Sequence, residues 1–587
     1  MKAAPAEAVR RHAGTQGEAD VVRRQSDSNP KPKNPGTRMD DGDGTTMNGL
    51  MMQQSLLVSA LLVHAERHHR EQEIVSRRVE GDIHRYSFAE LAARARRVAN
   101  ALDALGLAEG ARVGTLAWNG YRHLELYYGV SGSGRVLHTL NPRLHPDQLA
   151  WVANHAEDEL LFFDLSFLPL VEAIAASVPT IKRFVALCDR AHLPASAAIP
   201  GLLCYEELLD AASEHYRWPQ FDEQRASSLC YTSGTTGHPK GVLYSHRSTV
   251  LHTYAVALPD SLNCSARDTI LPVVPMFHVN AWGLPYAACM VGAKLVLPGQ
   301  GLDGKSLYEL FESEGVTVSA GVPTIWQGLL AHVESTGLKF STMRRTIIGG
   351  SACPPAMMRA FQERHGVQVL HAWGMTETSP LGTSGVLKRA QLALPAEQRE
   401  AIQSKQGRAV FGVDMKIVGE DGQELPWDGV KSGELMVRGP WIAAQYLHGE
   451  GRDMLVDGWF ATGDVGTIDA DGFMLITDRA KDVIKSGGEW IGSIEIENIA
   501  AAHPAVAMAA CIAARHPKWD ERPLLIVVKK PGAEVTREAL LQFFEGRIAK
   551  WWTPDDVVFV DAIPLGATGK MLKHRLREQF QDHLETA

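Results

Sequence analysis

A segment rich in glycine and hydroxyl side chains most strongly limits how this chain can fold. It follows the strand-like run 227–230, precedes a helix-like stretch, and reads Tyr231-Thr232-Ser233-Gly234-Thr235-Thr236-Gly237-His238-Pro239-Lys240-Gly241. Glycines let the backbone approach a phosphate, hydroxyls and free N–H groups donate hydrogen bonds, and Lys240 adds positive charge. The spacing differs from the Walker A pattern. A polar surface loop would explain the composition but not this order, so the segment predicts a nucleotide-phosphate loop at the end of a strand.

The rest of the chain predicts an α/β protein with at least two domains. With 587 residues it exceeds one typical core. Helix-like stretches such as 88–107 alternate with short apolar runs at 113–117, 160–164 and 184–187, which is typical of largely parallel sheets. Shorter strands around 435–437 and 467–468, with Asp-Gly turns, predict antiparallel hairpins.

The domain boundaries follow from changes in sequence character. Residues 1–46 lack apolar periodicity and an apolar signal core, so we expect a disordered N-terminal extension. Residues 47–478 are predicted to form the large domain. Beyond Asp478 the sequence becomes a compact α+β segment that ends in a basic helix, 570–577, and we assign residues 479–587 to a small C-terminal domain.

Composition excludes several functions. A net charge of -9 provides no basic field for nucleic acid, and no apolar run of about 18 residues predicts a membrane span. Seven scattered cysteines without a CxxC pair favour reduced thiols and a cytoplasmic location. We therefore expect small-molecule partners, no nucleic acid and no integral membrane contact.

The phosphate-loop segment resembles that of the adenylate-forming superfamily, which includes acyl-CoA synthetases, peptide-synthetase adenylation domains and beetle luciferases. The resemblance extends from about residue 55 to about residue 580, with the motifs in the family's order. Val274–Trp282 is similar to bacterial medium-chain fatty-acid CoA ligases and methylmercaptopropionate-CoA ligases. The resemblance implies a large domain of mixed sheets, helices and a β-barrel-like subdomain, followed by a small mobile α+β domain; it also allows a homodimer.

The resemblance implies a nucleotide and metal site. Trp373 would stack on adenine beside Gly374, Thr376 would contact the α-phosphate, and Glu377 would hold Mg²⁺, a hard cation that prefers carboxylate oxygen. Asp464 would grip the ribose hydroxyls with help from Arg479. The preceding loop contributes Gly349, Gly350, Ser351 and Ala352. Thr232–Gly237 and Lys240 would hold the phosphates.

The C-terminal motifs imply a hinge and a catalytic lysine. Lys481 occupies the hinge position, with an exposed loop lysine as the alternative. Gly487, Gly488 and Glu489 would line the pantetheine tunnel, with a simple tight turn as the alternative. Lys570 matches the catalytic lysine, whose ammonium bridges the acid's carboxylate and the α-phosphate. Leu565-Gly566 departs from the usual Lys-Thr before it.

The acid pocket is expected around two apolar segments. The first contains His278 and Trp282, and the second contains Gly321, Val322 and Pro323. In amino-acid-activating relatives an Asp takes the position of His278 and pairs with the ammonium, so its absence favours an apolar acyl chain. His278 would border the carboxylate or gate the tunnel, unless it is a core histidine. We expect Trp282 and Trp326 to close the tunnel at short to medium chain length.

Together the motifs predict an ATP-dependent acyl-CoA synthetase that uses ATP, Mg²⁺ and coenzyme A and passes through an acyl-adenylate. Activation of methylmercaptopropionate is an alternative for the acid. A fatty-acyl-AMP ligase that feeds a carrier protein is a second alternative. A catalytically inactive binding protein of the same fold is disfavoured because Lys240, Glu377, Asp464 and Lys570 are all present.

Overall fold

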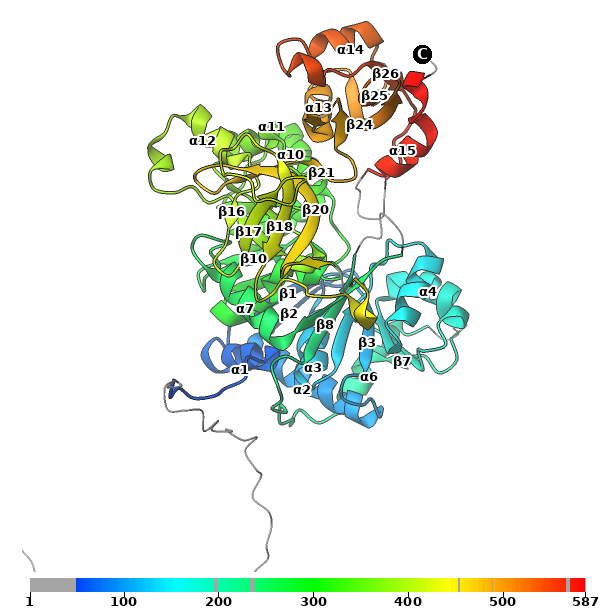
Figure 1. Ribbon diagram of the computed structural model, residues 1–587. Helices are drawn as coiled ribbons and strands as arrows, with labels where there is room; N and C mark the ends of the chain where they lie inside the picture. Colours follow the sequence, from blue (N-terminus) through cyan, green and yellow to red (C-terminus); the bar gives the residue numbers. More distant parts are fainter. Residues whose placement is uncertain are drawn as a thin grey trace, which may run out of the picture. The chain divides into compact units, whose positions relative to one another are not determined.

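The computed structural model describes residues 49–194, 199–232, 238–451, 454–487, 489–565 and 571–585, with the backbone alone for 489 and 490. The chain divides into the units Met1–Gln54 and Ser55–Ala587, and the architecture given below is that of the second (Figure 1). The predicted disorder of residues 1–46 lies outside the described residues. Across the described ranges, none of the helices combines the length and apolar character that a membrane crossing requires.

A seven-stranded sheet carries the phosphate loop at one edge. Its order is β7-β6-β5-β3-β4-β8-β9, parallel except for the pair β8–β9. The strands are β3 (Arg112–Leu116), β4 (Val136–Thr139), β5 (Asp158–Phe163), β6 (Arg183–Ala186), β7 (Leu203–Cys204), β8 (Ala226–Tyr231) and β9 (Gly241–Ser245). The helices in this part of the chain are α1 (Val58–His68), α2 (Phe88–Ala104), α3 (Tyr121–Gly132), α4 (Pro146–His155), α5 (Leu168–Ile174) and α6 (Tyr205–Asp210).

A nine-stranded sheet carries most of the other predicted site segments. Its order is β16-β15-β14-β13-β12-β10-β11-β1-β2, parallel from β14 to β1 and antiparallel at both ends. The strands are β1 (Glu73–Arg77), β2 (Ile83–Ser87), β10 (Thr269–Pro272), β11 (Lys294–Leu297), β12 (Val318–Gly321), β13 (Arg345–Ile348), β14 (Gln368–Gly374), β15 (Leu381–Ser384) and β16 (Arg408–Ala409). The helices are α7 (His246–Ala257), α8 (Leu284–Val291), α9 (Gly304–Glu314), α10 (Pro323–Thr336), α11 (Pro355–Arg359) and α12 (Ala396–Gln403).

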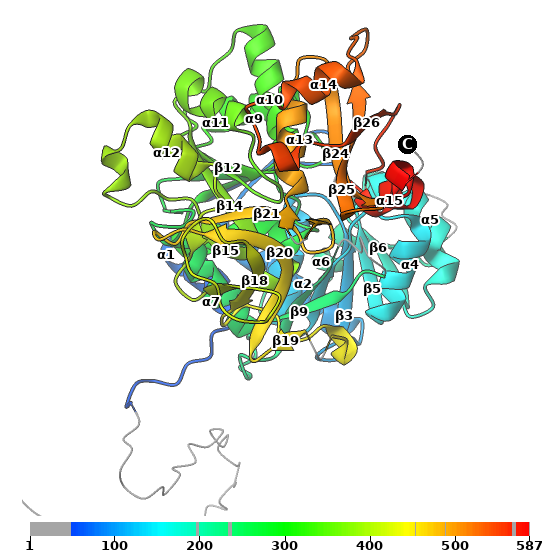
Figure 2. The ribbon, with the colours of Figure 1, turned by 45° about the horizontal axis from the view of Figure 1, so that its top comes forward.

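Two smaller sheets follow. The first is antiparallel and contains β17 (Asp414–Val418), β18 (Gly433–Arg438), β19 (Leu455–Val456), β20 (Trp459–Ile468) and β21 (Met474–Arg479). The second contains β22 (Ile484–Ser486), β23 (Glu489–Ile491), β24 (Val506–His516), β25 (Asp520–Lys529) and β26 (Asp556–Phe559). Helices α13 (Ser493–Ala501) and α15 (Lys573–Phe580) pack against β24, and α14 (Arg537–Phe543) packs against β26 (Figure 2).

Local sequence accounts for these elements. Ser87 and Glu90 form a reciprocal capping box at the start of α2, and Gly315, at φ 65°, ends α9 in the left-handed conformation. The predicted strands at 113–117, 160–164 and 184–187 fall on β3, β5 and β6, and the hairpin strands at 435–437 and 467–468 fall on β18 and β20. The predicted fold class, α/β with mixed sheets and an α+β C-terminal part, is therefore confirmed.

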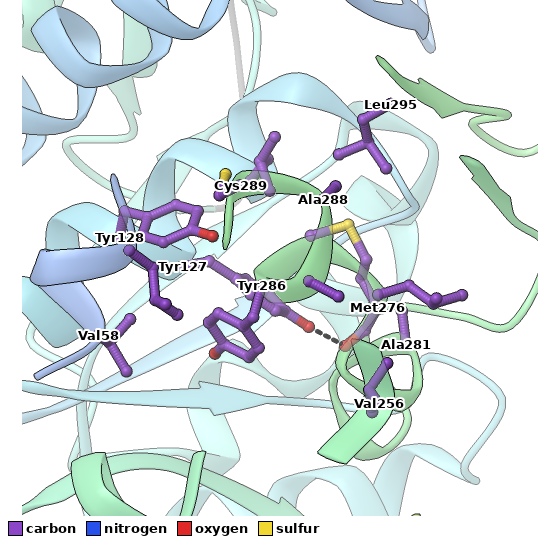
Figure 3. Close-up of a cluster of buried hydrophobic side chains, with 14 of the residues drawn as sticks. Val58, Tyr127, Tyr128, Val256, Met276, Ala281, Tyr286, Ala288, Cys289 and Leu295 are labelled. Carbon is purple, nitrogen blue, oxygen red and sulfur yellow. Dashed lines mark hydrogen bonds between the residues drawn. The ribbon is translucent and has the colours of Figure 1, made fainter. Parts of the chain in front are cut away.

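The largest apolar core joins α1, α2, α3, α7 and α8 to the sheets. Figure 3 shows part of it, where Tyr127 and Tyr128 of α3 meet Tyr286 of α8. Tyr127 Oη donates a hydrogen bond to the carbonyl of Met276 (Figure 3). The core thus contacts Met276, which lies two residues before the predicted pocket residue His278.

Candidate active site

Hydrogen bonds join the two ends of the phosphate-loop segment. Thr232 N donates to the carbonyl of Lys240 over 2.9 Å, and Lys240 N donates to Thr232 Oγ1 over 3.0 Å. The predicted ligands Ser233, Gly234, Thr235, Thr236 and Gly237 lie outside the described residues. The helix predicted after the loop is α7, which begins at His246, but the strand β9 comes first and pairs with β8. The alternating burial of β9, with Leu243 exposed between buried Val242 and Tyr244, is typical of such a strand.

A stack of aromatic rings lies against the loop's second half. The ring of Trp151, on α4, lies between His238 at 4.4 Å and His155 at 4.6 Å, measured between centroids, and both pairs are stacked. His155 Nδ1 is also 2.7 Å from Tyr231 Oη at the end of β8. Stacked rings are worth about 0.5–1.5 kcal/mol per pair. These contacts, which the sequence did not indicate, connect α4 to both ends of the loop.

The predicted nucleotide residues Trp373, Asp464 and Arg479 come together. Trp373 Nε1 donates to Asp464 Oδ2 over 2.9 Å, and Arg479 Nε lies 2.9 Å from Asp464 Oδ1. Asp464 on β20 faces Arg479 on β21 in the sheet register. A Cβ on Gly374 would lie 1.8 Å from the carbonyl oxygen of Pro380, so only glycine fits beside Trp373. The carboxylate, guanidinium and indole thus form one polar surface.

The loop after β13 approaches the same strand. His371 on β14 accepts a hydrogen bond from Cys353 N at 3.2 Å and pairs with the carbonyl of Ser404 at 3.0 Å. Burial lowers the pKa of His371 to about 4, so its ring stays neutral and can accept. Ser351 is exposed and Ala352 is half-buried in the loop held this way. The sequence did not single out His371.

Glu377 is a buried carboxylate next to cationic groups. Tyr446 Oη donates to Glu377 Oε1 over 2.7 Å, and Tyr244 Oη donates to the carbonyl of Thr376 over 2.7 Å. Burial raises the pKa of Glu377, while the Tyr446 hydrogen bond and the charges of Arg479 and Lys240 oppose that rise. Lys240 Nζ lies 4.8 Å from the Tyr446 ring centre. A buried anion gains from a bound cation, so the setting of Glu377 fits the predicted magnesium ligand.

His278 directly precedes a left-handed turn, and Trp282 is part of that turn. Val279, Asn280, Ala281 and Trp282 have φ values of 45°, 51°, 49° and 56°. For residues other than glycine this conformation costs about 1–2 kcal/mol each. A small pocket beside the turn is bordered by Phe277 and His278 and by Tyr231 and Thr232 of the phosphate-loop segment. His278 therefore lines the same pocket as the start of the phosphate-loop segment.

Trp282 lies over the glycines that follow β13. A Cβ on Gly349 would be 3.2 Å from Trp282 Cη2, and a Cβ on Gly350 would be 3.2 Å from Val322 Cγ1 and 3.9 Å from Trp282 Cζ2. Trp282, Val322 and Gly350 thus converge on one apolar surface. Gly321 ends β12, and Pro323 occupies the first turn of α10. These predicted pocket residues are brought together.

Trp326 does not lie beside Trp282. It is fully buried in a separate apolar cluster, where its ring packs near Phe311 and Phe361 and beneath Gly321. The expectation that Trp326 helps to close the tunnel stays a prediction. The first turn of α10 directs this side chain to the core side of the sheet, which a run of apolar residues in the sequence does not reveal.

The hinge and thiol-tunnel segments are described in part. Lys481 lies between β21 and β22, and burial lowers its pKa. Gly487 has a φ of 59°, and its N–H donates to the carbonyl of Trp519 over 3.1 Å. Gly488, the Glu489 side chain and Lys570 lie outside the described residues. The predicted basic helix 570–577 corresponds to α15, which begins at Lys573.

Comparison with known proteins shows the family to which the chain belongs. The AMP-binding enzyme family matches residues 62–447, and the AMP-binding enzyme C-terminal domain matches residues 495–570. A 3-methylmercaptopropionyl-CoA ligase of Ruegeria lacuscaerulensis is 55% identical over 92% of this chain and 100% of its own length. A medium-chain-fatty-acid–CoA ligase of Ectopseudomonas oleovorans is 53% identical over 92% of this chain and 98% of its own.

Among solved structures, ATP-bound MatB from Rhodopseudomonas palustris superimposes with a TM-score of 0.76 at 28% identity, covering 90% of this chain and all of that chain. The fold thus defines an adenylate-forming enzyme. The chain belongs to the AMP-binding enzyme family, and within the adenylate-forming superfamily it is an acyl-CoA synthetase.

Proposed function

We propose that this synthetase activates short- to medium-chain carboxylic acids, including thioether acids such as methylmercaptopropionate, and transfers them to coenzyme A in the cytoplasm. The observation that carries the proposal is the apolar surface formed by Trp282, Val322 and Gly350. No carboxylate follows Phe277 to pair with an ammonium group. Burying an unpaired ammonium is costly, whereas a methylene or a sulfur is readily desolvated.

Adenylation follows from the charges around Glu377. The acid's carboxylate oxygen attacks the α-phosphorus of ATP, and pyrophosphate leaves in line. Lys240 and the phosphate loop hold the outgoing phosphates, while Trp373, Asp464 and Arg479 orient the nucleoside. Mg²⁺ held by Glu377 would supply charge neutralisation at the phosphates. Lys570 would bridge the carboxylate and the α-phosphate, and such preorganised charge in a dry site contributes several kcal/mol to catalysis.

Thioester formation follows from the same adenylate. The thiol of coenzyme A attacks the acyl carbonyl, the C–O bond to AMP breaks, and the thiol proton passes to solvent. Rotation of residues 479–587 about Lys481 would withdraw Lys570 and bring Gly487, Gly488 and Glu489 to the thiol arm. The position of Lys481 between β21 and β22 supports this hinge role.

The setting of the cysteines supports the proposed location, because all seven are buried free thiols. The proposed homodimer would appear in sedimentation velocity as about twice the 64.1 kDa chain mass.

The test is a ligation assay across a panel of acids. Purified enzyme receives ATP, Mg²⁺, coenzyme A and either straight-chain acids from acetate to palmitate, methylmercaptopropionate, or amino acids of matching length. Acyl-CoA and AMP are both quantified. We expect efficiency to rise about fourfold per methylene and to stop rising in the short- to medium-chain range. A continued rise to palmitate would overturn the chain-length proposal, and AMP without thioester would indicate a ligase that feeds a carrier protein.

A further inference from the structure

The left-handed turn Val279–Trp282 is a strained element that the surrounding structure must hold. Four consecutive residues other than glycine adopt positive φ, and one of them, Val279, is β-branched. Such residues rarely adopt this conformation, and asparagine accepts it more readily than most. Strain of this kind persists only where neighbouring contacts fix the backbone, and it gathers at functional sites.

Asn280 supplies the polar contacts that fix the turn. Its side chain is buried, Nδ2 donates to Ser228 Oγ over 3.0 Å, and Oδ1 accepts from Cys230 Sγ at 3.6 Å. Cys230 Sγ is in turn 3.2 Å from Thr139 Oγ1 on β4. The amide therefore uses both ends of its side chain to join the turn to β8 and, through Cys230, to β4.

Apolar packing holds the other side of the turn. Ala281 is fully buried in the cluster drawn in Figure 3, next to Met276. Gly283, at φ 78°, ends the turn against the ring of His252, where a Cβ would lie 2.8 Å from Cε1. His252 Nε2 also accepts a hydrogen bond from Leu381 N over 3.2 Å. The turn is thus held by apolar packing against the core and by the hydrogen bonds of Asn280 to β8.

The strand reached by Asn280 leads into the phosphate loop. Ser228 and Cys230 lie on β8, and the next residues, Tyr231 and Thr232, open the loop. His278 directly precedes the turn and Trp282 belongs to it, and both are predicted acid-pocket residues. Asn280 is therefore a direct side-chain connection between the segment that would hold the acid and the strand that carries the phosphate loop.

We propose that Asn280 is a positioning residue that sets the distance between the bound carboxylate and the α-phosphate. This inference rests on the proposed function. In-line attack needs the reacting atoms about 3–3.5 Å apart, and a displacement of about 1 Å can lower the rate about 100-fold. A preformed acyl-adenylate already contains the bond between the two groups, so its reaction with coenzyme A depends far less on this distance.

The test uses Asn280→Gly, which keeps the freedom for positive φ but removes both side-chain contacts. We expect acid-dependent ATP–pyrophosphate exchange to fall about 100-fold in kcat/KM for the acid. Conversion of supplied acyl-adenylate to thioester should fall less than about threefold, and the KM for ATP should stay within about twofold. Asn280→Asp, which keeps the left-handed preference and one acceptor, should retain more exchange activity than Asn280→Gly.

Two controls separate positioning from a general structural role. Asn100→Ala removes side-chain hydrogen bonds of 2.6 Å and 3.1 Å to carbonyls remote from the site and should leave both half-reactions unchanged. Ser228→Ala removes the partner of Asn280 Nδ2, and its effect should not add to that of Asn280→Gly. Equal losses in both half-reactions, or no loss, would overturn the proposal. Absence of acid-dependent exchange in the unmodified enzyme would instead overturn the proposed function.

Discussion

Replacing Trp282 with alanine should lengthen the acids that the enzyme prefers. The indole lies over Gly349 and Gly350 and packs beside two apolar clusters. An aromatic side chain of this size buries about 200 Å², which at about 25 cal/mol per Å² equals about 5 kcal/mol, or about six methylenes at about 0.8 kcal/mol each. Neighbouring side chains fill part of such a space. We therefore expect the optimum to move by about two to four methylenes.

The assay is kcat/KM for acyl-CoA formation along a straight-chain series, with unmodified enzyme and Trp282→Ala side by side. Trp326→Phe is the matched control, because Trp326 is fully buried in an apolar cluster that does not include Trp282. The control should lower thermal stability without moving the optimum. An unchanged optimum in Trp282→Ala, or an equal shift in Trp326→Phe, would refute the assignment of Trp282 to the end of the pocket.

Three further predictions concern metal, nucleotide and pH. Glu377→Gln keeps shape but removes charge, so the Mg²⁺ concentration for half-maximal adenylation should rise and kcat should fall about 100-fold; an unchanged Mg²⁺ titration would place the metal elsewhere. Trp151→Ala removes two stacked pairs worth about 1–3 kcal/mol together, so the KM for ATP should rise about 5- to 150-fold while the KM for the acid stays constant, and Trp151→Phe should restore most of the loss. Burial lowers the pKa of His252 to about 3. It also lowers the pKa values of His123, His246 and His371 to about 4. Below about pH 6.5 the unfolded chain binds a proton at each of these histidines, whereas the folded chain does not. For each histidine, the free energy of unfolding should therefore fall by about 1.4 kcal/mol per pH unit as the pH drops towards 4. A melting temperature that is constant from pH 6.5 to 4.5 would contradict this.

The sequence predicted those site residues that lie in motifs typical of the family. Trp373, Asp464 and Arg479 are far apart in the chain, yet each is recognisable from its neighbours, and the structure brings the three side chains together. Gly374 is also understandable from sequence, because close approach of the backbone requires glycine.

Contacts made only by tertiary packing could not be predicted. Tyr446 reaches Glu377 from a loop after β18, and Trp151 reaches the phosphate loop from α4. Neither residue has a local pattern that indicates a partner. The strand β9, which comes before the helix predicted after the phosphate loop, was not expected, because pairing with β8 decided the conformation of that segment.

The left-handed turn shows a third limit. Asparagine tolerates positive φ, whereas valine, alanine and tryptophan do not. The intrinsic preferences of Val279, Ala281 and Trp282 therefore favour a backbone conformation with negative φ. Tertiary contacts with β8 and the apolar core override that preference. Local and global preferences disagree where the predicted acid and phosphate segments meet, which is where a functional site is expected.

The most direct test of the account is acid-dependent exchange of labelled pyrophosphate into ATP, measured first without and then with coenzyme A. We predict that exchange requires Mg²⁺ and a short- or medium-chain acid but not coenzyme A, and that adding coenzyme A converts the bound adenylate into equal amounts of acyl-CoA and AMP. Release of ADP, or exchange that proceeds equally well without any acid, would contradict the account.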